Sequence, residues 1–351
     1  MSYLNYCLIM LWVDKHRPSK LEELSFHDTT TKRLKSFAAS SSLPHLLIYG
    51  PSGSGKKTRI NALLREVFGP ASQKLKLDKR TFTTPTKRTV DINMVSSNFH
   101  VELSPGDAGL NDRYVVQQVI REMASHKVIG TAADYKVVVL TEVDRLTRQA
   151  QAALRRTMEK YASTCRLILV CNSPSKVMDP VRSRCLGIRV AAPTHDEICQ
   201  VLKTVANKES IVLPDELAVN IARNSGRNCR RAVLMLESCH VQRRDGLTAD
   251  MLVPATDWEL YIKQLAVDIT REQTPQRLLA AREKLYELLV NCIPATIIIK
   301  TLVQEILGNL DDSLKKEVIE WAAFYEHRIA MGSKDIFHLE AFVGKYMAIY
   351  K

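Results

Sequence analysis

A glycine-rich loop that ends in two lysines is the feature of this sequence best suited to chemistry. It runs from Gly50 to Lys56 with the spacing GxxxxGK, after the apolar run 46–49 and before a helical pattern. The glycines let successive backbone N–H groups turn towards a phosphate, and the start of the next helix adds its dipole. Lys56 would reach the outer phosphates. The spacing predicts a nucleotide site whose loop residues are Gly50, Pro51, Ser52, Gly53, Ser54, Gly55, Lys56, Lys57 and Thr58.

The position after Lys56 departs from the usual phosphate loop. A Ser or Thr hydroxyl is expected there as a ligand to Mg²⁺, but the residue is Lys57, and Thr58 comes one position late. Taking Lys57 as the phosphate lysine does not repair the pattern, because Lys56 would then stand where close backbone approach needs glycine. The loop therefore predicts a nucleotide site with an altered metal contact.

The residues that follow a second apolar run also depart from the usual pattern of a metal-binding nucleotide site. Residues 137–140 lead into Thr141 and Glu142, where an Asp for the metal and a Glu that polarises the attacking water are usual. Glu142 keeps the water-activating position, but Thr141 replaces the aspartate. We predict that nucleotide binds with weak or absent use of Mg²⁺, with the Lys57 ammonium neutralising the phosphates, and assign no metal ligand. The alternative is that water-bridged Mg²⁺ still serves and the site hydrolyses slowly.

The elements that must position these residues follow from periodicity. The apolar runs 46–49, 137–140 and 167–171 have the length and composition of buried parallel strands, and amphipathic helices are expected after Gly55 and Thr147. Strand alternating with helix predicts an α/β core, a doubly wound parallel sheet.

Only helical patterns follow the α/β core. Thr194 can cap the first of these helices, and a polar, Pro-containing stretch, 243–256, precedes a last helical segment. In that segment one apolar stripe, 336, 339, 343 and 347, is interpreted as core, with a subunit interface as the alternative. The sequence thus predicts two helical domains after the core.

Composition limits the partners and the compartment. The 50 Lys and Arg residues against 38 Asp and Glu give a net charge of +12, which favours a nucleic acid partner, with an acidic protein as second choice. The 8 cysteines form no CxxC pair and are interpreted as reduced core thiols in a reducing compartment. Residues 1–10 are interpreted as a leader, either disordered or an extension of the gene model. They lack the pattern of a signal peptide or membrane anchor.

Three further segments carry a family resemblance. Residues 11–18, LWVDKHRP, resemble the WVDKYRP box of the replication factor C small subunits, with His16 in place of tyrosine. In the same order, 152–159 is similar to the family's ALRRTME helix, and 183–185 matches its SRC motif. The likeness runs from Leu11 to the end of the chain, and the two-lysine loop with the TEVD strand resembles one branch of the family.

The resemblance implies an architecture and a set of site residues. The expected domains are an AAA+ nucleotide-binding core at 11–191, a helical lid at 192–253 and a helical collar at 254–351, through which five subunits assemble into an open ring. Each nucleotide, ATP or ADP, would lie at a subunit interface, and Arg184 would act in trans as an arginine finger on the neighbouring site. Further nucleotide contacts implied by the resemblance are Trp12, Val13, Arg17, Asn172 and Arg230.

The same resemblance implies partners and location. Four other clamp-loader subunits, the sliding clamp and primer-template DNA are expected in the nucleus, in DNA replication and repair, with no membrane contact. Candidate DNA contacts are helix starts at Arg113, Thr147 and Arg148, because unpaired N–H groups and the helix dipole suit phosphates.

The chain alone would be a weak or inactive ATPase within a DNA-dependent ATPase complex. Two other classes stay open: a motor-type AAA+ ATPase, which needs its own metal site, and a nucleotide-independent scaffold, which would not need Arg184, Asn172 or Arg230.

Overall fold

The computed structural model describes residues 10–40, 43–83, 89–125, 135–243, 246–248, 251–332 and 334–351. The leader segment 1–9 and part of the stretch 243–256 lie outside the described residues. The chain divides into two compact units, Met1–Val253 and Pro254–Lys351.

A seven-stranded sheet forms the centre of the first unit, in the order β2-β3-β4-β5-β6-β1-β7. From β4 to β7 along this order all neighbours are parallel, as predicted. A hairpin of β2 and β3 adds two antiparallel strands at one edge, so the sheet is mixed rather than wholly parallel. The strands are β1 Leu46–Tyr49, β2 Lys76–Thr83, β3 Thr89–Ser96, β4 His100–Leu103, β5 Lys136–Leu140, β6 Cys165–Cys171 and β7 Leu186–Arg189.

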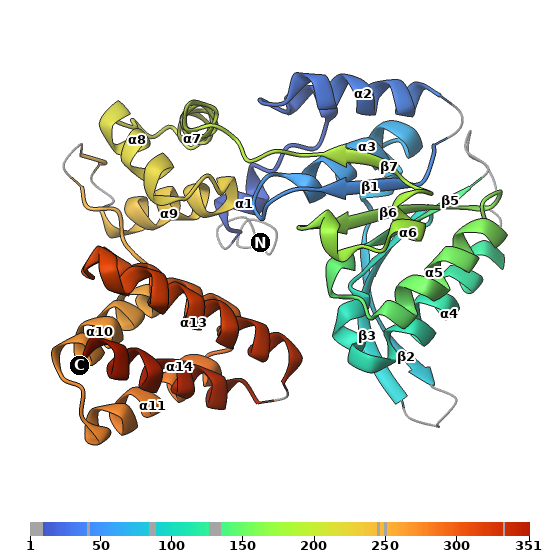
Figure 1. Ribbon diagram of the computed structural model, residues 1–351. Helices are drawn as coiled ribbons and strands as arrows, with labels where there is room; N and C mark the ends of the chain where they lie inside the picture. The colour runs from blue at the N-terminus through green and yellow to red at the C-terminus, as the bar shows by residue number, and fades with distance from the viewer. Residues whose placement is uncertain are drawn as a thin grey trace. The chain divides into compact units, whose positions relative to one another are not determined.

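Helices cover both faces of this sheet (Figure 1), which explains the continuous apolar runs of its central strands. On β5, Val137 and Val139 join the core under one face, whereas Val138 and Leu140 join the core under the other. The helices of the first face are α2 Asp28–Ala39 and α3 Lys56–Phe68, and those of the second are α4 Asp112–Ser125 and α5 Arg148–Lys160. Shorter elements are α1 Trp12–Lys15, η1 Leu21–Glu23, η2 Pro70–Gln73, η3 Pro105–Asn111, η4 Val143–Arg145, η5 Pro174–Lys176 and α6 Asp179–Arg182.

Three helices complete the first unit: α7 His195–Lys208, α8 Asp215–Asn224 and α9 Cys229–Gln242. The predicted cap of α7 is present as a capping box, in which Thr194 Oγ1 accepts from Glu197 N at 3.2 Å and Thr194 N donates to Glu197 Oε2 at 2.7 Å. The apolar faces of these helices form one core, which also holds the side chain of Trp12. We call these three helices the lid.

The second unit is entirely helical among its described residues. Its helices are α10 Asp257–Arg271, α11 Pro275–Val290, α12 Ala295–Gly308, α13 Asp312–Met331 and α14 Asp335–Tyr350. The stripe of Ile336, Leu339, Val343 and Met347 on α14 is buried in the core of this unit, as its interpretation as core predicted. In the part of the chain that the structure describes, no helix is both long and apolar enough to cross a membrane.

The cysteines among the described residues are all free, and Cys165, Cys171 and Cys239 are buried. Burial raises the pKa of the Cys165 thiol to about 12. These buried thiols are apolar core groups, as predicted, whereas Cys292 is exposed and the prediction of a core thiol is wrong for that residue.

Candidate nucleotide-binding site

The glycine-rich loop joins the carboxyl end of β1 to the first turn of α3, the place where nucleotides bind in open α/β sheets. Gly55 stands at the N-cap of α3 with φ +83°, a conformation that side chains with a Cβ rarely adopt. Gly53 has φ +73° and also approaches another element closely. The local sequence therefore produces the loop geometry predicted for phosphate binding.

Lys56 is held inside this loop. Its Nζ donates to Gly50 O at 2.6 Å, to Pro51 O at 2.8 Å and to Asn172 Oδ1 at 2.9 Å. Burial lowers the pKa of Lys56, and the nearby Cys171 and Asp144 oppose that shift. The structure thus brings the phosphate lysine and Asn172 together, although they are far apart in the sequence.

Asp144 is a site residue that the sequence analysis missed. Its Oδ2 accepts from Asn172 N at 3.2 Å and from Ser173 N at 3.4 Å, so it fixes the backbone at the end of β6. Its Oδ1 is buried and has no hydrogen-bond partner among the described residues, which leaves one acceptor for a bound donor. Its place two residues after Glu142, in the short helix η4 that follows β5, was the available signal.

The residues at the usual metal and water-activating positions all have partners within the chain. Lys57 Nζ lies 2.5 Å from Glu102 Oε1, and the Glu102 side chain on β4 is only 11% exposed. Thr141 Oγ1 donates to Leu103 O at 3.2 Å, and Glu142 pairs with Arg145 at 2.8 Å. Thr58, whose hydroxyl comes one position later than the usual metal ligand, accepts a hydrogen bond from Arg17 Nε at 3.2 Å.

These contacts do not fit a magnesium ion held directly by this chain. In nucleotide sites Mg²⁺ is usually bound by one or two protein oxygens together with phosphates and water. Here the ammonium of Lys57 and the carbonyl-bonded hydroxyl of Thr141 stand at the positions of those oxygens. Glu102, the partner of Lys57, could not be found from the loop motif. It comes from a neighbouring strand, and only the pairing of β4 with β5 brings it to the site.

A cavity of about 140 Å³ lies between the phosphate loop, the N-terminal segment and the lid. Burial lowers the pKa of Arg17, the carboxylate of Asp14 opposes that shift, and the positive charge of Arg230 lowers the pKa further. Seven predicted nucleotide contacts line this cavity: Trp12, Val13, Arg17, Gly53, Gly55, Thr58 and Arg230.

The lid closes directly on the phosphate loop. Cys229 N donates to Gly53 O at 3.3 Å, and a Cβ added at Gly53 would lie 1.7 Å from Asn228 Oδ1. That same oxygen caps α9 by accepting from Arg231 N at 3.2 Å. Asn228 occupies a position where the family pattern has Asp, and here it serves both the helix and the loop.

This contact predicts a steric effect that can be separated from backbone strain. Gly53→Ala and Gly226→Ala both place a Cβ on a residue with positive φ, which costs about 1–2 kcal/mol. Only the Gly53 variant must also displace Asn228, since nothing lies within 4 Å of a Cβ at Gly226. We expect Gly53→Ala to lower the free energy of unfolding in urea by about 1–3 kcal/mol more than Gly226→Ala. Equal decreases would show that the lid does not rest on Gly53.

Arg59 supports the loop from beneath. Its fully buried guanidinium donates from Nη2 to Phe26 O at 2.8 Å and from Nη1 to Ser54 O at 3.2 Å, and it lies 4.7 Å from the centre of the Phe26 ring. Burial lowers the pKa of Arg59 to about 10. The sequence analysis missed this residue, because an arginine in a helical pattern is usually on the surface.

Arg184 does not line the nucleotide cavity of its own chain. It follows α6, and its side chain is held by Glu159 of α5 and by the carbonyl of Pro180. This separation is what a residue acting on another subunit requires.

The starts of α4 and α5 are tied together by the buried Asp112. Its carboxylate accepts from Arg113 N at 2.7 Å, Thr147 N at 2.7 Å and Thr147 Oγ1 at 2.9 Å. Thr147 Oγ1 also caps α5 by accepting from Ala150 N. The Thr147 hydroxyl and N–H are therefore already bonded, and the exposed side chains of Arg113 and Arg148 remain as the candidate DNA contacts.

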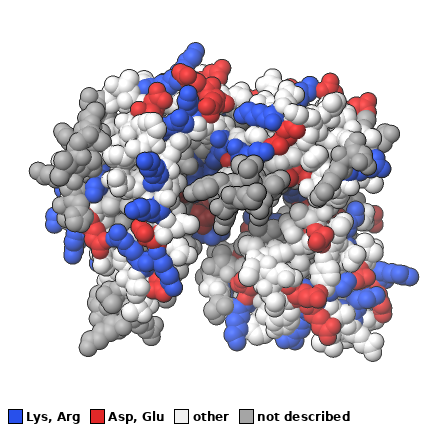
Figure 2. Space-filling view, turned by 180° about the vertical axis from the view of Figure 1, so that it is seen from behind, with Lys and Arg blue, Asp and Glu red and all other residues white. Residues whose placement is uncertain are grey.

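Lys and Arg side chains are interspersed with Asp and Glu on the face of the molecule seen in Figure 2. The excess of positive charge does not gather there into one large patch.

Comparison with protein-family models gives three matches along the chain. Residues 26–194 match "DNA polymerase III, delta subunit", residues 200–241 match "RCF1/5-like, AAA+ ATPase lid domain", and residues 258–351 match "Replication factor C subunit 3, C-terminal domain". The matches cover the sheet, the lid and the second unit in turn.

Curated relatives match over almost the whole length. "Replication factor C subunit 3" of Bos taurus is 53% identical over 97% of this chain and 96% of its own, and "Replication factor C subunit 5" of Oryza sativa is 52% identical over 97% and 98%. Among solved structures, a point mutant of Thermotoga maritima RuvB has a TM-score of 0.52 at 17% identity, covering 77% of this chain and 85% of its own. That likeness shows the AAA+ fold alone.

Proposed function

The chain belongs to the family of replication factor C subunits 3 and 5, and we propose that it is a small subunit of a five-subunit clamp loader. We infer that this chain binds nucleotide without holding magnesium directly, and that its Arg184 acts on the nucleotide bound by a neighbouring subunit. This branch is the one that the two-lysine loop and the TEVD strand resemble.

The observation that carries the proposal is the pair of Lys57 and Glu102. A cation stands where a metal-binding hydroxyl is usual, and a nearly buried carboxylate holds it there at 2.5 Å. The neighbouring Thr141 hydroxyl is bonded to a backbone carbonyl. The chain therefore keeps a phosphate loop while both direct contacts to magnesium are replaced.

The groups present fit a bound ATP or ADP. Lys56 donates to loop carbonyls and to Asn172, and a phosphate can take over as its acceptor. Arg17 and Arg230 line the adjoining cavity and offer two further cations. When bound, the nucleotide supplies phosphate oxygens that join the loop, the N-terminal segment and the lid. In this chain its role is to order these parts rather than to be cleaved.

A chain that provides an arginine finger but has an altered metal site fits a position at one end of the open ring of subunits. At that end no neighbouring subunit would complete its own nucleotide site. The motor-type alternative needs its own metal site, which Lys57 and Thr141 argue against. The scaffold alternative leaves the arrangement of Lys56, Asn172 and Asp144 without a purpose.

Assembly is tested by purification of the native chain from nuclear extract, since nuclear residence and DNA replication are part of the proposal. We expect four related AAA+ chains to co-purify with it, and the complex to bind the sliding clamp and primer-template DNA. Recovery of the chain as a monomer would contradict the assembly.

The DNA contacts give a separate prediction. Arg113→Ala or Arg148→Ala in the complex is expected to weaken binding to all DNA sequences alike, and to reduce the slope of log affinity against log salt by about one unit for each phosphate that is no longer neutralised. Arg33→Ala is the matched control, because Arg33 is an exposed arginine on α2, which covers the opposite face of the sheet. A slope that changes equally in all three variants would count against the contacts.

A further inference from the structure

The guanidinium of Arg184 is held along one edge by a single carboxylate oxygen. Its Nε donates to Glu159 Oε1 at 2.7 Å, and its Nη2 lies 2.6 Å from the same oxygen. On the other side, Nη1 donates to Pro180 O at 2.7 Å and to Ser183 Oγ at 3.4 Å. The side chain is 29% exposed, so part of the group still faces solvent.

The donors of the guanidinium show which part of it remains for a ligand. An arginine carries five N–H groups in a rigid planar fork. Glu159 takes the edge formed by Nε and Nη2, and Pro180 O takes one N–H of Nη1. Among the described residues the second N–H of Nη2 has no bonded partner, and at Nη1 the long 3.4 Å bond to Ser183 Oγ is one that a phosphate oxygen can replace. The end of the fork, between Nη1 and Nη2, can therefore turn to a phosphate with two parallel bonds.

We propose that Glu159 is a positioning residue for Arg184: it fixes the side edge of the guanidinium, so that the end of the fork is presented to the phosphate of the neighbouring subunit. This inference rests on the proposed role of Arg184 in trans. Glu159 itself touches no reacting group and acts through Arg184.

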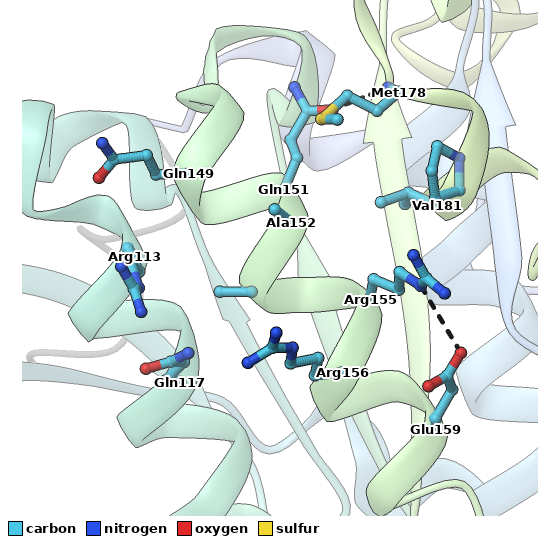
Figure 3. Close-up of a pocket in the computed structure, with 12 residues that line it drawn as sticks. Arg113, Gln117, Gln149, Gln151, Ala152, Arg155, Arg156, Glu159, Met178 and Val181 are labelled. Atoms are coloured by element: carbon cyan, nitrogen blue, oxygen red, sulfur yellow. Dashed lines mark hydrogen bonds and ion pairs between the residues drawn. The ribbon is translucent and has the colours of Figure 1, made fainter.

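The charged side chains nearest to Glu159 on α5 are arginines, which attract its carboxylate and cannot accept a hydrogen bond from Arg184. Arg155, one turn earlier on α5, has its Nε 3.8 Å from the same Oε1, and Figure 3 shows the two side chains facing each other. Arg156 points the other way, towards Arg113 on α4 (Figure 3). These residues line a groove of about 520 Å³ beside Arg184, which does not itself line it, and the three arginines of the groove outnumber the carboxylate of Glu159.

Stability alone does not account for the arrangement of these groups. The Glu159 side chain is 51% exposed, and exposed ion pairs contribute about 0–1 kcal/mol to folding. Variants at Glu159 should therefore fold normally. The pair is better explained by the direction it gives to Arg184.

The test uses the reconstituted five-subunit complex in which only the site facing Arg184 can hydrolyse ATP, the other phosphate loops being disabled. We expect Glu159→Ala to slow single-turnover hydrolysis about 10- to 100-fold while the affinity of that site for ATP stays the same. Glu159→Gln keeps an acceptor oxygen for Nε and should recover most of the rate. Asp179→Ala is the matched control, since Asp179 pairs with Arg182 at 2.8 Å beside Arg184 without contacting it.

The double variant Arg184→Ala with Glu159→Ala is expected to hydrolyse ATP no more slowly than Arg184→Ala alone, because Glu159 acts only through Arg184. If Arg184→Ala slows the reaction and Glu159→Ala does not, or accelerates it, the positioning role is overturned while the finger stands. If Arg184→Ala has no effect, the finger itself is wrong, and the role of Glu159 falls with it.

Discussion

Replacing Arg184 with alanine is expected to lower ATP hydrolysis at the site of one neighbouring subunit by about 10³- to 10⁵-fold, or roughly 4–7 kcal/mol in the barrier. The reason is that a guanidinium directed at the γ-phosphate stabilises charge that develops only in the transition state. The measurement is single-turnover hydrolysis by the reconstituted complex, compared site by site. In steady state only one site's share of the total should disappear.

Two features make this prediction specific to Arg184. The neighbouring Arg182 pairs with Asp179 at 2.8 Å and is the matched control, because Arg182→Ala removes an exposed arginine from the same segment. Nucleotide binding by the altered chain itself should not change, since Arg184 lies outside its own cavity. Unchanged turnover and unchanged clamp loading would refute the arginine finger.

Chelation of magnesium is expected to change the affinity of this chain for ADP or ATP by less than about twofold, because Lys57 supplies the positive charge that a metal gives elsewhere. Isothermal titration with and without EDTA measures this directly. Lys57→Thr should bind about tenfold more weakly in EDTA and regain its affinity with Mg²⁺, because the hydroxyl then stands at the usual ligand position.

Lys35→Thr is the control for this experiment, since Lys35 is also an exposed lysine paired with a glutamate, Glu22, at 3.1 Å. It should alter neither affinity nor metal dependence. If the nucleotide affinity of the unaltered chain falls sharply in EDTA, Lys57 does not take the place of the metal. Brisk, metal-dependent ATP hydrolysis by the purified chain alone would contradict the proposed function as a whole.

The sequence predicted those parts of the fold and site that depend on local pattern. The phosphate loop, the strand before it and the helix after it are contiguous, so spacing and periodicity were sufficient. The cap at Thr194 is local in the same way. The hairpin of β2 and β3 was missed because its strands are largely exposed and polar, and they lack the apolar runs of the central strands.

The partners that complete the site could not be predicted, because they come from distant parts of the chain. Glu102 reaches Lys57 only through the pairing of β4 beside β5, and Asn228 reaches Gly53 only when the lid folds against the core. Glu159 and Arg184 lie on separate elements that meet in space. No spacing rule connects such residues, although each decides the orientation of a residue that the motifs did identify.

The two margins of the sheet have a consequence for how the chain avoids unwanted association. One outer strand, β2, carries Lys76, Lys79 and Arg80, and the other, β7, is only four residues long and ends at Arg189. Short or cationic outer strands resist pairing with the strands of another molecule. The two edges of the sheet are thus protected from fibre-like, strand-to-strand aggregation.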